Sequence, residues 1–175
     1  MRIGTTVVLG SALTAALTTP AIFAADLNVK VDIPRLNVAE YHKPYVAMWV
    51  EAADQSLAQN LTVWYDLKKR DNEGTKWLKD LRQWWRKSGR DLQMPVDGLS
   101  GATRAPGEQT ISFNSAKVGL DKLPAGEYAL VVEAAREVGG RELVRLPFQW
   151  PSKTAQNAQA QGEHELGKVV LSVKP

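Results

Sequence analysis

The feature that most constrains the fold of this sequence is a series of short apolar segments separated by residues that favour turns. In the first segment, Leu27, Val29, Val31 and Ile33 alternate with polar residues, which is the period-two pattern of a strand with one buried face. The seven predicted strands span residues 27–33, 45–51, 61–65, 109–113, 127–133, 143–150 and 168–173. Such a series predicts a mainly β fold, an immunoglobulin-like antiparallel β-sandwich of about seven strands.

One stretch between these strands has a helical pattern instead. Its apolar side chains recur with the spacing of one face of an amphipathic helix, namely Trp77, Leu78, Leu81, Trp84 and Trp85. We expect a helix over about 76–88, ended near Gly89 and followed by an irregular loop over 95–107. The segment 156–162 is polar and is predicted to be a loop.

The first 25 residues have the composition of a secretory signal. Arg2 is the only charged residue before Asp26, and the stretch between them is apolar and rich in small residues. An uncleaved membrane anchor is the alternative, but Ser, Thr and Pro interrupt the apolar stretch. We therefore predict a signal peptide over 1–25, a single domain over 26–175, a periplasmic location and no stable membrane span.

Composition excludes several classes of site. The sequence has no cysteine, which removes disulfides, thiolate metal sites and cysteine nucleophiles, and it has only two histidines, which makes a histidine-rich metal site improbable. No Ser-His-Asp arrangement, phosphate-binding loop or dinucleotide motif is evident. We expect no catalytic residues and no enzyme activity from the chain alone, and no nucleic-acid partner for an exported protein.

Charge is distributed unevenly along the chain. The segment 68–90 contains nine Lys or Arg and three acidic residues, a net charge of +6, whereas the whole chain carries +3. This basic segment favours an anionic ligand or partner, or it is a solvated helix face. Six charged residues between Glu133 and Arg145 alternate in sign around Gly139-Gly140, and we expect them to form weak cross-strand ion pairs.

The loop after the predicted helix contains a short motif. Residues 97–103 read Asp-Gly-Leu-Ser-Gly-Ala-Thr, and they resemble the flavinylation motif of FMN-binding domains in exported bacterial redox proteins. In that family an FMN transferase, using Mg²⁺, joins the FMN phosphate to the hydroxyl of the last Thr. The resemblance implies covalent FMN on Thr103, with Asp97, Ser100, Gly101 and Ala102 as recognition positions. Family members usually have further Thr or Ser after the motif, whereas here Arg104-Ala105-Pro106 follows, so a structural turn remains the alternative.

A second resemblance covers nearly all of the chain after residue 25. It rests on 44–51, 76–90, the 100–107 loop and 133–145, and it is to a family of predicted periplasmic proteins, domain-of-unknown-function family 2271. This resemblance implies association with PepSY-type membrane proteins and FMN transferases, in transmembrane electron transfer or iron uptake.

Two functions therefore stay open. In the first, the domain carries electrons on bound FMN, with Arg104 and Arg86 near the phosphate and Trp85 stacked on the isoalloxazine ring. Trp77 and Trp84 are also candidates for stacking, but we favour packing against the sandwich for both. In the second, the protein is a non-catalytic binding or assembly module that uses its basic, Trp-rich helix as the contact surface.

Overall fold

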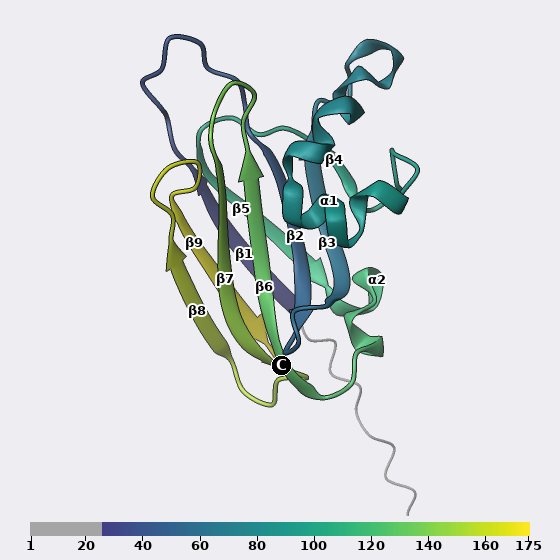
Figure 1. The fold of residues 1–175 in the computed structure, drawn as a ribbon. Coiled ribbons are helices and arrows are strands. Elements are labelled where there is room, and N and C mark those ends of the chain that lie inside the picture. Colours follow the sequence, from purple (N-terminus) through teal and green to yellow (C-terminus); the bar gives the residue numbers. More distant parts are fainter. Residues whose placement is uncertain (1–25) are drawn as a thin grey trace, which may run out of the picture.

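The computed structural model of the protein describes residues 26–175, and the predicted signal segment 1–25 lies outside the described residues. Two β-sheets pack face to face (Figure 1). One sheet has four strands in the order β5-β1-β9-β8, and the other has five in the order β4-β3-β2-β6-β7. The predicted mainly β sandwich is confirmed.

The strands of the first sheet are β1 (Asp26–Ile33), β5 (Gly107–Asn114), β8 (Gln156–Gln161) and β9 (Lys168–Lys174). Those of the second are β2 (Tyr45–Ala52), β3 (Leu57–Tyr65), β4 (Ser100–Ala102), β6 (Gly126–Ala135) and β7 (Arg141–Trp150). All neighbouring strands are antiparallel except β3 and β4, which are parallel.

Residues 26–175 thus contain nine strands rather than about seven. The segment 156–162, predicted as a loop, instead forms β8, an edge strand whose Ala158 and Ala160 pack against the core. The other additional strand, β4, lies within the predicted 95–107 loop and pairs with the end of β3 through backbone hydrogen bonds. Neither strand has the large β-branched or aromatic side chains that reveal a strand in a sequence.

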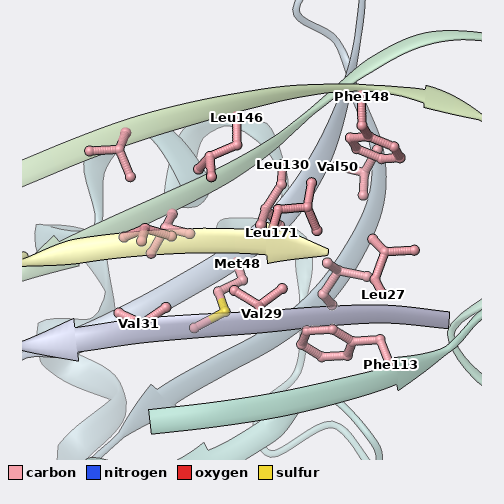
Figure 2. Close-up of a cluster of buried hydrophobic side chains, with 14 of the residues drawn as sticks. Leu27, Val29, Val31, Met48, Val50, Phe113, Leu130, Leu146, Phe148 and Leu171 are labelled. Atoms are coloured by element: carbon pink, nitrogen blue, oxygen red, sulfur yellow. The ribbon is translucent and has the colours of Figure 1, made fainter. Parts of the chain in front are cut away.

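The main core lies between the sheets (Figure 2). Every second residue of β1 points into it, and Leu27, Val29, Val31 and Ile33 are at most 1% exposed. Met48 and Val50 of β2 face them from the other sheet (Figure 2). The alternation in the sequence therefore identifies the buried face correctly, because a strand turns successive side chains to opposite faces.

A second apolar cluster covers the outer face of the five-stranded sheet. There the residues of β2 that point away from the main core, Tyr45, Ala47 and Trp49, pack against Leu78 and Trp84. These two side chains come from a helical segment made of η1 (Arg70–Asp80), α1 (Arg82–Lys87) and η2 (Gly89–Asp91), drawn in teal beside β2 and β3 (Figure 1). Two further short helices, α2 (Ser115–Val118) and η3 (Leu120–Lys122), precede β6. Strand β2 is buried on both faces, which explains its continuous apolar sequence.

The predicted single helix over 76–88 is broken at Leu81, whose ψ of 70° is not helical. The break frees the backbone N–H groups at the start of α1. The carboxylate of Glu133, on β6, accepts from Gln83 N at 3.0 and 3.1 Å and from Trp84 N at 2.9 Å. A buried acceptor far away in sequence thus satisfies groups that a continuous helix would have bonded internally.

The charged residues from Glu133 to Arg145 are not the weak surface pairs that were expected. Glu133 is fully buried and also accepts from Arg141 Nη1 at 3.0 Å. Arg136 forms a two-bond pair with Glu165, and these side chains are only 7% and 4% exposed. Ion pairs between strands were predicted and are found for Glu133–Arg141, but they are buried on one side, and further partners lie on α1 and on the loop before β9.

Candidate functional site

Several strand ends meet at one edge of the five-stranded sheet. Strand β2 begins there, and the antiparallel strands β3 and β6 end there. Because β4 runs parallel to β3, its last residue, Ala102, lies at the same edge, beside Tyr65. The loop before β2, the β6–β7 turn, the start of the helical segment and the last residues of the predicted flavinylation motif are therefore neighbours at the upper end of Figure 1.

A cleft of about 280 Å³ opens at this edge. Its lining residues come from five parts of the chain: Tyr41, His42, Lys43, Tyr45, Asp66, Trp77, Asp80, Thr103, Ala135 and Glu137. Its volume is close to the lower end of the ~300–1,000 Å³ typical of small-molecule sites.

Thr103 lies directly after β4 and lines this cleft. Its backbone N–H donates to Tyr65 O at 3.2 Å, which continues the β3–β4 pairing by one residue. Its hydroxyl Oγ1 lies 3.5 Å from Asp66 Oδ1, the long limit of a hydrogen bond. The backbone of Thr103 is thus held by the sheet while its half-buried hydroxyl remains close to the cleft.

The other motif residues lie along the approach to Thr103. Asp97 is exposed and lines a different hollow, near the β3 residues 59–61. The hydroxyl of Ser100 accepts from Val96 N at 2.9 Å and so closes a turn. Gly101 allows close packing, since a Cβ there would be 3.1 Å from Trp64 Cδ1, and Ala102 is exposed.

Arg104 has a specific contact of its own. Its Cζ atom lies 5.2 Å from the centre of the Trp64 ring, a distance at which a guanidinium is attracted to the face of an indole. Arg104 is otherwise exposed and follows Thr103 directly. The Arg104 guanidinium therefore lies over Trp64, a residue of the main core, and is not among the residues that line the cleft.

Trp85 and Arg86, by contrast, are not brought to the cleft. The neighbouring Trp84 donates from Nε1 to Asn60 Oδ1 at 2.9 Å, in the middle of β3. Asn60 and Tyr65 are separated by five residues, or about 17 Å of extended strand. Trp85 packs at the edge of the outer apolar cluster, and the Arg86 guanidinium turns back to the carbonyl of Arg82. The cleft instead contains Trp77, for which the sequence had favoured a packing role.

Aromatic side chains form much of the cleft wall. Trp77 is 37% exposed, whereas Leu78, next to it in η1, is fully buried. The hydroxyl of Tyr45 donates to Gly74 O at 3.0 Å, and burial raises the pKa of Tyr45 to about 12. Gly74 is needed there because a Cβ would collide with the carbonyl of Asp66. These contacts fix η1, and with it Trp77, against the end of the sheet.

Tyr41 contributes an unsatisfied group. Its hydroxyl oxygen is buried, and among residues 26–175 it has no hydrogen-bond partner. Burial raises the pKa of this hydroxyl, and the nearby Arg136 opposes that increase. A buried hydroxyl without a partner is costly and uncommon, and a bound ligand with an acceptor atom would satisfy it.

The charges in the cleft are mainly negative. Asp66, Asp80 and Glu137 line it, against the single lysine Lys43. His42 lies between carboxylates, with Nδ1 3.5 Å from Glu137 Oε2 and Nε2 3.1 Å from Glu40 Oε1. Within the described part of the chain no three His, Asp or Glu side chains form a group suited to a metal ion. The interior of the cleft therefore favours a neutral or cationic group over an anion.

The cleft suits the ring of an FMN group attached at Thr103. The phosphodiester would lie close to the Asp66 carboxylate, so the Arg104 side chain, next in sequence, would have to turn from Trp64 to neutralise it. The oxidised isoalloxazine ring is uncharged and flat, and its carbonyl oxygens and ring nitrogens accept hydrogen bonds. Trp77 offers that ring an aromatic surface, and the Tyr41 hydroxyl offers it a donor.

Sequence reasoning found the motif but not the rest of the cleft. The signal for Asp66 and Glu137 is topological, because they follow the ends of β3 and β6 at the same sheet edge, whereas Trp77 lies inside η1. For Trp77, the amphipathic pattern suggested burial. Only the break at Leu81 shows that the apolar side chains of η1 and α1 need not all point toward the sheet.

The chain was compared with known proteins in three ways. The family model described as "Predicted periplasmic protein (DUF2271)" matches residues 26–168. Neither the curated proteins nor the solved structures gave a match. Among residues 26–175, no helix is both long and apolar enough to cross a membrane.

Proposed function

Because this chain belongs to the DUF2271 family of predicted periplasmic proteins, we propose that it serves as a periplasmic electron carrier with FMN bound covalently to Thr103. The observation that carries this proposal is the position of Thr103. The last residue of a flavinylation-like motif lines a cleft that also contains Trp77, Tyr41 and Tyr45. Periplasmic location also favours a covalent bond, which prevents loss of the cofactor by diffusion.

Attachment is a phosphoryl transfer. The Thr103 oxygen attacks the phosphorus of the flavin-bearing phosphate, and a new P–O bond forms. FMN itself has no good leaving group on its phosphate, so the donor in this proposal is the dinucleotide FAD. Its pyrophosphate bond breaks, AMP leaves, and the hydroxyl proton passes to a base or to water. An FMN transferase supplies Mg²⁺ and the catalysis, as the motif resemblance implies.

In this reaction the chain itself holds the Thr103 hydroxyl in place for the transferase. The backbone of Thr103 is held by Tyr65 O, and the preceding Gly101 and Ala102 have little or no side chain to obstruct a transferase. Ser100, the nearest other hydroxyl, is bonded to the Val96 N–H at the turn. These differences favour Thr103 over Ser100 as the acceptor.

When bound, FMN supplies the redox chemistry, and the protein supplies its placement and surroundings. In this proposal the chain is not an enzyme by itself, since turnover needs a donor and an acceptor of electrons. A PepSY-type membrane protein is the proposed partner, in transmembrane electron transfer or iron uptake.

Mass spectrometry of the intact protein tests this function. The wild type, Thr103→Ala and Ser100→Ala are produced in the periplasm of a host that expresses an FMN transferase. We expect a mass gain of one flavinyl phosphate, and a flavin-fluorescent band on a denaturing gel, for the wild type and Ser100→Ala but not for Thr103→Ala. Unmodified wild type in the presence of active transferase and Mg²⁺ would overturn the proposal.

One observation favours a second function, that of a binding module. Among the described residues, Lys68, Arg70, Lys79 and Arg82 form no ion pair, so the helical segment has an exposed, uncompensated positive surface. Such a surface attracts an acidic protein partner. Colourless protein under the conditions above, together with salt-sensitive capture of an acidic periplasmic protein that is lost when these four residues are changed to Gln, would establish this function instead.

A further inference from the structure

The cleft distinguishes one tryptophan from the others. The sequence has six, and in the structure Trp49, Trp64, Trp84 and Trp150 are at most 4% exposed, and Trp85 is partly buried. Trp77 has the most open ring face, at 37% exposure, and it lines the same cleft as Thr103.

Resting on the proposed function, we propose that the isoalloxazine ring of a flavin on Thr103 packs against Trp77, with the Tyr41 hydroxyl as a hydrogen-bond donor to the ring. Trp77 is thus a binding residue for the ring, and Trp85 and Arg86 have no part in it.

The first argument is position. Trp77 and Thr103 are 26 residues apart in sequence, yet both line one cleft of about 280 Å³. Leu78 lies in η1 and Leu81 directly follows it. Both side chains are fully buried and hold the segment to the sheet. Trp77 is therefore fixed through its backbone while its ring faces the cleft, and a partner that covers it gains apolar burial at little cost in ordering.

The second argument is the unsatisfied hydroxyl of Tyr41. This residue lines the cleft with Trp77, and its oxygen has no partner among residues 26–175. A polar group that accepts from this hydroxyl, or donates to it, removes that penalty. A ring that combines a flat aromatic surface with carbonyl oxygens satisfies both Trp77 and Tyr41, which an aliphatic ligand would not.

The charge of the cleft also favours the ring over the phosphate. Asp66, Asp80 and Glu137 line the cleft, and their carboxylates repel an anionic phosphate but not an uncharged ring. With the phosphate fixed on Thr103, the uncharged ring is the part of the group that the cleft accepts.

Flavin fluorescence tests this arrangement, because an indole in contact with an excited flavin quenches its emission by electron transfer. The wild type, Trp77→Leu and the matched control Trp85→Leu are each isolated with the covalent flavin, and equal loading is verified by intact mass. We expect several-fold brighter flavin emission, and stronger quenching by iodide, in Trp77→Leu than in the other two proteins. Trp77→Phe should restore protection from iodide.

Two failures are distinguishable. If the wild type carries no adduct at all, the proposed function fails. If every protein is loaded but Trp77→Leu and the wild type have the same emission and the same iodide quenching, flavinylation stands and the ring site is wrong. Because a misfolded variant would also expose its flavin, urea unfolding of each loaded protein is measured as well. Brighter emission from a Trp77→Leu protein that does not unfold cooperatively like the wild type would count against the ring site, as would equal emission.

Discussion

The two halves of the helical segment contact the same sheet in different ways. In the half from 82 to 91, polar groups are buried and paired. Glu133 accepts three backbone hydrogen bonds, Asn60 bonds both Trp84 and Ser88, and Lys87 lies 3.1 Å from Glu51. In the half from 70 to 80, Leu78 and the Tyr45–Gly74 bond make the attachment, and Trp77 is left exposed.

This difference suggests that the two halves of the helical segment have different roles, one structural and one in the proposed site. Buried polar groups that are fully satisfied in one arrangement make that arrangement rigid, and they leave no group for a ligand. The half from 70 to 80, by contrast, leaves Trp77 exposed in a cleft that also contains the unpaired Tyr41 hydroxyl and Thr103. We infer that 82–91 fixes the segment and that 70–80 forms the site.

The largest expected effect on the free energy of unfolding is the difference between two tryptophan variants. Trp84→Ala removes a fully buried indole and its bond to Asn60 and should lower the free energy of unfolding by about 3–5 kcal/mol. Trp77→Ala, at a 37% exposed position, should lower it by less than about 1 kcal/mol. Urea unfolding of both variants checks this, and equal losses would break the distinction between the two halves.

The next largest effect on stability is the difference between two glutamate variants. Glu133→Gln replaces a fully buried carboxylate that holds α1 and Arg141, and should cost about 2–4 kcal/mol. Glu137→Gln, at a 36% exposed side chain in the cleft, should change stability by no more than about 0.5 kcal/mol. The same unfolding experiment applies, and a marginal effect of Glu133→Gln would show that this carboxylate does not fix the helix.

A third effect depends on pH. Burial by itself would raise the pKa of Glu51, but hydrogen bonds from Arg145, Lys87 and Trp49 lower it overall from its ordinary value of 4.5. A lowered folded-state pKa means that the stabilisation is present above 4.5 and is lost as the pH falls through the folded value.

Glu51→Gln should therefore cost about 1–3 kcal/mol at neutral pH and flatten the acid side of the stability curve. Unfolding free energies measured from pH 7 downward for the variant and the wild type check the sign. A variant curve parallel to that of the wild type would contradict the assignment.

The smallest effect on stability belongs to Thr103→Ala. The hydroxyl has one long contact, to Asp66, so the free energy of unfolding of the unmodified protein should change by no more than about 0.5 kcal/mol. Thermal unfolding of both unmodified proteins checks this. A larger loss would mean that Thr103 is a structural residue, and that a missing adduct in the variant reflects misfolding.

Local sequence was sufficient for much of the fold. The seven predicted strands are found in the structure because hydrophobic alternation and turn residues are local signals that act over a few positions. The edge strand β8 also alternates, but its inward residues include small alanines, so the pattern is weak. The pairing of β4 with β3 depends on backbone groups alone and leaves no mark in the side chains.

The site was less predictable, for a physical reason. The motif around Thr103 is contiguous and visible in the sequence. The break at Leu81 depends on Glu133, about 50 residues away, and the cleft depends on the ends of β2, β3, β4 and β6 meeting at one edge. Consequently the sequence favoured Trp85 and Arg86 as companions of Thr103, whereas the fold brings Trp77 and Tyr41 to it.

The most direct test of the central claim is to locate the flavin on the wild-type chain. Trypsin cleavage after Arg90 and Arg104 releases the peptide 91–104, in which Ser100 and Thr103 are the two hydroxyl-bearing residues. Tandem mass spectrometry of protein produced with an FMN transferase should place one flavinyl phosphate on Thr103, in fragments that exclude Ser100. A flavin on Ser100, on any other peptide, or on none would contradict the account.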